Sequence, residues 1–148
     1  MQLPISLLLA ATLAAIPALA APVAPAKSMA VADAAEWTIE TFTRTCADTS
    51  FCDYYFFIDT HVSAVPTCDY RIWAANGATA QNTNYNGISC GIYTISSGWS
   101  GQFGPGNGFS TLAVTDGHNI VYPAYTDNQL VNGQAVSPDQ SYPVQVIA

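Results

Sequence analysis

Histidine and carboxylate side chains are the groups in this chain that are best suited to acid–base chemistry. The 148-residue sequence has two histidines, His61 and His118, and ten aspartate and glutamate residues. Neither histidine lies in a metal-ligand spacing such as H-E-x-x-H. The members of a Ser–His–Asp triad need only meet in space, so the sequence neither places nor excludes one. We expect each histidine to be a solvated turn residue or a hydrogen-bonded structural one.

The carboxylates carry a weak signal for glycoside hydrolysis, because ten acids give many pairs by chance. Asp53 and Asp59 flank an aromatic segment, and Asp127 and Asp139 lie in turn-like sequence, where aspartate commonly caps or is solvated. We therefore expect no catalytic residue and no enzyme activity. The sequence also has no cofactor motif, and no cofactor is expected.

Four cysteines indicate a disulfide framework: Cys46, Cys52, Cys68 and Cys90. Three pairings are possible, and we expect the sequential one because it closes the shortest loops. In the chain-entropy model the two loops contribute about 2 and about 3 kcal/mol to stability. The spacings lack the paired C-x-x-C units of a structural zinc site, so no metal is expected.

Residues 96–109 are rich in glycine and also hold three large aromatic side chains. The five glycines and one proline of this segment predict that most of it has no regular structure. It lacks the G-K-[ST] ending of a phosphate-binding loop. Trp99, Phe103 and Phe109 either plug the open end of a barrel or form an exposed binding surface. We expect the plug, because exposed aromatic clusters are costly, and keep the three residues as a candidate binding loop.

The N-terminus has the pattern of a secretory signal peptide. An apolar run from Leu3 to Leu13 precedes Ala18-Leu19-Ala20, which fits the small-x-small cleavage pattern. A membrane span needs about 20 continuous apolar residues, and Pro4 and Pro17 bracket a shorter stretch. We predict a signal peptide over residues 1–20, a flexible Ala/Pro-rich leader over 21–35, a β domain over 36–148, and a secreted, extracellular protein without membrane insertion.

Short segments of β-type sequence, separated by turn signals, fill the rest of the chain. This pattern predicts a single all-β domain, a small disulfide-stabilised β-sandwich or β-barrel. Phe42 breaks the alternation begun by Trp37 and Ile39, which indicates a β-bulge. Asp116-Gly117 predicts a hairpin turn, and a single helical turn is expected after Tyr125. The expected strands are 52–60, 67–73, 88–96, 111–115 and 119–122, followed by an irregular or edge segment over 135–148. The aromatic strand 52–60 is expected to be buried largely on both faces.

The charge balance excludes two classes of partner. Three basic residues stand against ten acidic ones, and the formal net charge is -7. This composition lacks the basic surface that nucleic acid or an anionic membrane would require.

Several strings of this sequence resemble the secreted hypersensitive response-inducing proteins of filamentous fungi. They are W-T-I-E-T-F-T-R-T-C (37–46), D-T-S-F-C (48–52), I-D-T-H (58–61), S-G-W-S-G-Q-F-G-P-G-N-G-F (97–109), I-V-Y-P-A-Y-T-D (120–127) and V-S-P-D-Q-S-Y (136–142). The resemblance covers about residues 29–148, and the four cysteines match the family's order.

The resemblance implies a secreted fungal elicitor that triggers defence and cell death in plants by surface recognition and without catalytic residues. Its partner would be a plant host receptor or a cell-wall component. The alternative is a module that binds or degrades cell-wall polysaccharide. That alternative requires the loop aromatics to line an open groove where sugar rings could stack.

Overall fold

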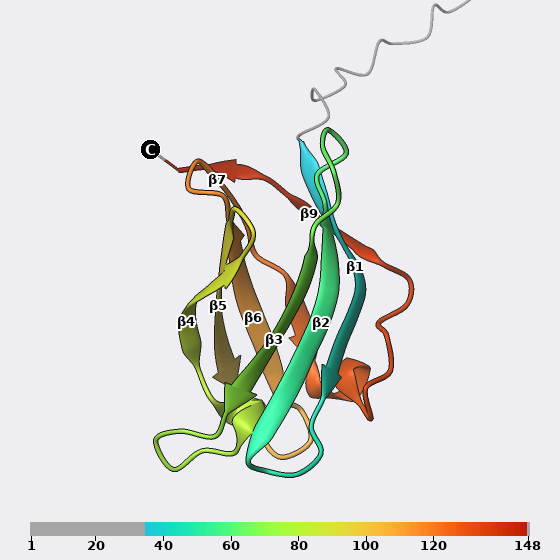
Figure 1. The fold of residues 1–148 in the computed structure, drawn as a ribbon. Helices are drawn as coiled ribbons and strands as arrows, with labels where there is room; N and C mark the ends of the chain where they lie inside the picture. Colours follow the sequence, from blue (N-terminus) through green and yellow to red (C-terminus); the bar gives the residue numbers. More distant parts are fainter. Residues whose placement is uncertain (1–34, 148) are drawn as a thin grey trace, which may run out of the picture. The chain divides into compact units, whose positions relative to one another are not determined.

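The protein is a two-layer β structure (Figure 1), described here by a computed structural model for residues 35–147. The predicted signal peptide and residues 21–34 of the leader lie outside the described residues. Sheet A has the strand order β3 (Thr67–Trp73), β2 (Phe51–Asp59), β1 (Glu36–Thr45), β9 (Gln140–Pro143). Sheet B has the order β10 (Gln145–Val146), β7 (Asn119–Val121), β6 (Phe109–Thr115), β5 (Tyr93–Ser100), β4 (Tyr85–Cys90), and β8 (Ala124–Thr126) also pairs with β6. The predicted all-β, single-domain sandwich is confirmed.

Two single 3-10 turns connect the strands at one end of the sandwich. These are η1 (Ala80–Asn82), before β4, and η2 (Asp127–Leu130), directly after β8. The second is the helical turn that the sequence predicted. The Asp116-Gly117 hairpin is also confirmed, since β6 and β7 pair in antiparallel fashion on either side of it.

A β-bulge in β1 sets which of its side chains face the core. The register with β2 shifts between Glu40 and Thr43, and Thr41 has a φ of 54°. The Thr41 backbone N–H donates to Oδ1 of Asp139 at 2.8 Å, which satisfies a group that the bulge removes from the ladder. After the bulge the alternation resumes one residue out of phase, so that Phe42 and then Arg44 point inward.

The expectation that 52–60 is buried largely on both faces holds only for its inner face. The side chains of β2 alternate between buried and partly exposed, and Tyr55 is 38% exposed. Within residues 35–147 no second layer covers the aromatic residues of the outer face, and they pack across strands instead. One such pair joins Phe51 to Trp73, with ring centroids 5.3 Å apart.

Two other predicted segments also differ in the structure. Residues 88–96 are not one strand, because a turn at Gly91, which has a φ of 61°, and at exposed Ile92 separates β4 from β5. Regular structure also extends further into the glycine-rich segment than expected. Strand β5 continues to Ser100, which leaves residues 101–108 as the loop.

The core fills the space between the inner faces of the two sheets. The rings of Phe42 on β1 and Tyr125 on β8 stack at a centroid distance of 4.2 Å, and Phe56 of β2 lies 5.1 Å from Phe42. Burial raises the pKa of Tyr125 above its ordinary value. Aliphatic residues of both sheets complete this core, among them Ile39, Ile58, Ile95, Leu112, Val114 and Val121.

The two sheets are joined along both sides. On one side the Cys68–Cys90 disulfide links β3 to β4, the end strands of sheets A and B, and the hydroxyls of Tyr70 and Tyr85 are 2.8 Å apart on the same strands. On the other side the C-terminal segment passes from β9 in sheet A to β10 in sheet B (Figure 1). The Cys46–Cys52 disulfide closes the β1–β2 connection. The two pairs are those expected from the sequence.

Candidate functional site

The three aromatic residues of the candidate binding loop do not form the expected plug. Phe103 is 66% exposed, and Trp99 and Phe109 are half-buried. The rings of Phe103 and Phe109 lie 5.7 Å apart and line a shallow, mainly apolar hollow of about 260 Å³. The core is already filled by side chains of the two sheets, so the loop aromatics remain at its margin.

Trp99 is held separately from the two phenylalanines. Its backbone N–H donates to Oδ1 of Asn84 at 2.8 Å, and its indole Nε1 donates to Oδ2 of Asp127 at 2.9 Å. Two glycines allow the loop to approach this indole closely. A Cβ on Gly101 would lie 2.5 Å from Trp99 Cη2, and one on Gly108 would lie 2.8 Å from Trp99 Nε1.

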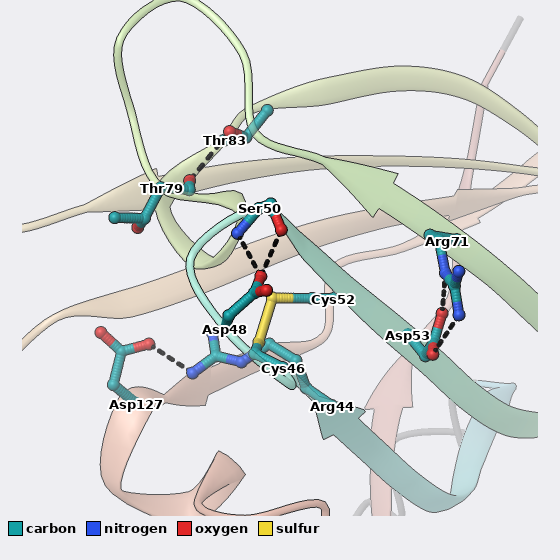
Figure 2. Close-up of a disulfide and its surroundings, with 10 residues drawn as sticks. All are labelled: Arg44, Cys46, Asp48, Ser50, Cys52, Asp53, Arg71, Thr79, Thr83 and Asp127. Atoms are coloured by element: carbon teal, nitrogen blue, oxygen red, sulfur yellow. Dashed lines mark hydrogen bonds and ion pairs between the residues drawn. A yellow bond between two sulfur atoms is a disulfide. The ribbon is translucent and has the colours of Figure 1, made fainter.

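Asp127 also accepts a bond from Arg44, an arginine inside the sandwich (Figure 2). The Nη2–Oδ1 distance is 3.0 Å, and the two side chains are 3% and 15% exposed. The remaining guanidinium nitrogens, Nε and Nη1, are buried and have no hydrogen-bond partner within residues 35–147. Burial raises the pKa of nearby Tyr54, and the positive charge of Arg44 partly offsets that increase.

Asp127 lines two surface hollows. The first, of about 490 Å³, is lined by Arg44, Thr45, Cys46, Gln81, Asp127, Leu130, Val131 and Asn132. The second, of about 470 Å³, is lined by Gln81, Asn82, Trp99, Asp127, Asn128 and the glycines and proline of the 101–108 loop. Such a set of amide, carboxylate and guanidinium groups can hold a polar ligand by hydrogen bonds.

His61 belongs to a separate chain of polar groups on the surface. Its Nδ1 lies 3.1 Å from Oδ2 of Asp59, and its Nε2 lies 3.0 Å from Oγ1 of Thr38. The Thr38 hydroxyl is in turn 2.8 Å from that of Ser141 on β9. The order carboxylate, imidazole, hydroxyl is the same as in a catalytic Ser–His–Asp triad. However, the His61 side chain is 54% exposed, and none of the hollows described above is lined by these residues.

His118 and a serine motif in β4 lie in turn and strand positions that do not form a catalytic site. His118 lies in the β6–β7 turn, where its backbone N–H donates to Oδ1 of Asp116 at 2.8 Å. A G-x-S-x-G string, Gly87 to Gly91, escaped the sequence analysis. It lies in β4 and at the turn into β5, whereas a serine nucleophile of this motif sits at a strand-to-helix turn.

Within the part of the chain that the structure describes, no group of three or more His, Cys, Asp or Glu side chains is placed to hold a metal ion. No helix within residues 35–147 is long and apolar enough to cross a membrane.

Arg44 and Gln81 were not expected from the sequence to be site residues, and Asp127 was expected only in a turn. The phase change at Phe42 was a usable signal for Arg44, because alternation continued from Phe42 places residue 44 on the inner face. No comparable sequence signal marks Gln81. It lines the same hollows as Asp127 only because the tertiary fold brings η1 and η2 to the same place.

The fold and the site define a small β-sandwich protein with two disulfides and a polar groove at one end. The family model described as Effector TSP1 matches residues 38–147 of the chain. A curated protein of Hypocrea virens (strain Gv29-8 / FGSC 10586), named Effector TSP1, is 47% identical over 138 residues, which cover 91% of this chain and 92% of that protein. The chain belongs to the Effector TSP1 family. The resemblance to a fungal effector or elicitor family is thereby confirmed.

Proposed function

We propose that this protein is a secreted fungal effector that elicits the hypersensitive response of plants through recognition of its folded surface, without catalysis. The observation that carries the proposal is the 47% identity to a fungal effector over nearly the whole length of both chains. The partner is a plant host receptor or a cell-wall component.

The disulfides support secretion and a rigid recognition surface. All four cysteines are paired, and such bonds form and persist in oxidising compartments outside the cytosol. Joining the end strands of the two sheets fixes the relative positions of their outer faces. A partner then meets a surface that is already ordered, which reduces the entropy lost on binding.

The outer face of β2 and β3 offers side chains of the kind that dominate protein-binding surfaces. Trp73 is 61% exposed, and Arg71 lies with its Cζ 4.0 Å above the ring of Phe51. Asp53 holds the Arg71 guanidinium through bonds to Nε and Nη2 of 2.6 and 2.8 Å. Tryptophan, tyrosine and arginine are enriched among the residues that contribute most to protein–protein affinity.

The exposure of His61 supports a non-catalytic mode of action. Water around a half-exposed imidazole screens the charges that a catalytic triad must stabilise. The Asp59–His61–Thr38 chain joins three segments of sheet A and its loops, which gives it a structural role.

Leaf infiltration tests the proposal. Protein purified from the medium of an expressing yeast is infiltrated into leaves of several plant species, in native form and after reduction and alkylation, and cell death is scored by ion leakage. We expect cell death from the native form and a clear loss from the reduced form. Absence of cell death in every species, or equal activity of the reduced form, would contradict the proposal.

A His61→Ala variant tests the mode of action in the same assay. We expect its cell-death activity to match that of the wild type, because recognition does not use the imidazole. Hydrolysis of p-nitrophenyl acetate is measured for both proteins as a direct readout of an activated hydroxyl. If His61→Ala abolished both cell death and a measurable esterase activity, the protein would act as an enzyme.

A further inference from the structure

The two hollows beside Asp127 adjoin and are together called the groove. Gln81 from η1 and Asp127 from η2 line both of them, so the hollows meet at these two side chains. The end of β1 forms one wall through Arg44, and the 101–108 loop forms the other. Each hollow, at about 470 to 490 Å³, falls in the range of small-molecule sites, roughly 300–1,000 Å³.

An almost fully buried arginine, Arg44, forms part of the wall of this groove. Arg44 is 97% buried, since its side chain is 3% exposed, and Asp127 engages one of its five N–H groups. Its Nε and Nη1 are without a partner within residues 35–147. Buried side-chain donors in folded proteins are nearly always hydrogen-bonded. The Tyr54 side chain lies beside the guanidinium and can accept from it inside the core, so Arg44 forms a fixed floor of the first hollow.

The charges of the groove favour a neutral ligand. The positive charge of Arg44 is offset by the carboxylate of Asp127, 3.0 Å away. The other residues that line the two hollows carry no charge. The net charge of the protein, -7, repels anions in addition.

The groups along the groove match the chemistry of a sugar. The amides of Gln81 and Asn128 both donate and accept hydrogen bonds, as a sugar hydroxyl does, and Asp127 adds acceptor capacity. Trp99 lines the second hollow with Gly101 and Gly108 packed against part of its indole, and the rest of its apolar surface is available to the C–H face of a pyranose ring. Glycines at the loop positions leave this wall without side chains that would obstruct a linear chain of sugars.

We propose that this groove binds a neutral oligosaccharide, with Gln81 and Asn128 bonding its hydroxyls, Trp99 contacting a ring face, and the Arg44–Asp127 pair fixing the floor. The site is separate from the outer face of β2 and β3, and it does not require that the protein elicit cell death.

Calorimetric titration with defined sugars tests the site. The probes are cellohexaose, laminarihexaose and chitohexaose, each titrated into the intact secreted protein up to millimolar concentration. We expect saturable binding of at least one of them. The Trp99 indole N–H resonance, assigned with a Trp99→Phe variant, should shift on addition of that sugar. Absence of binding by all three probes would overturn the proposal.

Two matched variants locate the site. Gln81→Ala removes an amide that lines both hollows, and Gln102→Ala removes an exposed glutamine of the same loop region that lines neither. We expect at least a tenfold weaker affinity for Gln81→Ala and an unchanged affinity for Gln102→Ala. Equal affinity of Gln81→Ala and wild type, or an equal loss in both variants, would overturn the proposed location.

Cell death, scored with the same preparations, separates this inference from the proposed function. Sugar binding without cell death supports the groove and contradicts the elicitor proposal. Cell death without sugar binding supports the elicitor proposal and overturns the groove.

Discussion

Arg44 and Asp127 form a buried ion pair, although 83 residues separate them in the sequence. Asp127 uses its second carboxylate oxygen for the indole of Trp99, and its backbone N–H donates to the carbonyl of Gly108 at 2.9 Å. The Asp127 side chain therefore connects β1 to β5, and its backbone connects η2 to the glycine-rich loop.

Replacing Asp127 by alanine should destabilise the protein strongly. Arg44 would remain buried without a counter-charge, and breaking such a pair costs about 3–5 kcal/mol. The free energy of unfolding is measured by urea denaturation. Asp53→Ala is the matched control, because its partner Arg71 and Asp53 itself are both substantially exposed, and an exposed pair contributes about 0–1 kcal/mol. Similar losses in the two variants would show that Arg44 is solvated.

The two disulfides should contribute unequally to stability. A Cys68→Ser/Cys90→Ser variant should lose about 3 kcal/mol and a Cys46→Ser/Cys52→Ser variant about 2 kcal/mol, because the first pair closes the longer loop. Thermal and urea unfolding of both variants measure the difference. A larger loss from the short loop would mean that native-state contacts, and not chain entropy, dominate.

Gly108 should tolerate a side chain poorly. A Cβ there would collide with the Asp127 carboxylate and lie 2.8 Å from the Trp99 indole. Overpacking of this kind costs about 1–3 kcal/mol, so Gly108→Ala should lower the free energy of unfolding. Gly98→Ala is the control, since its Cβ meets no atom within 4 Å and its φ is not positive. That variant should be neutral or gain up to about 1 kcal/mol.

Stability should fall in acid as Asp116 becomes protonated. Burial raises the pKa of this carboxyl, but bonds from the backbone N–H groups of Asn119 and His118 lower it more, so the net shift is below the ordinary 3.8. A lowered native pKa stabilises the fold above pH 3.8, and that contribution disappears as the pH falls through the native value.

An Asp116→Asn variant isolates this contribution. The amide oxygen can still accept from the turn, but it does not titrate. Urea midpoints between pH 7 and pH 2 should show the variant below wild type at pH 7, with the gap narrowing below about pH 4 as the wild-type carboxyl protonates. A gap that stayed constant across this range would assign the loss to altered hydrogen-bond geometry.

The sequence by itself determined the fold class, the bulge in β1, the Asp116-Gly117 hairpin and the sequential cysteine pairs. These features depend on local alternation, turn-forming residues and short loops, and each of these is set by residues that are close together in the sequence. The family could also be recognised from the sequence, because the string from Ser97 to Phe109 is long and unusual.

Tertiary structure alone decided where the strands pair and what meets at the end of the sandwich. The aromatic run of β2 suggested burial on both faces, yet whether a second layer covers that face depends on the arrangement of distant strands. The groove is the clearest case, since Arg44, Gln81, Trp99 and Asp127 come from four elements. Their contact depends on how the two sheets stack, and sequence spacing carries no information about that distance.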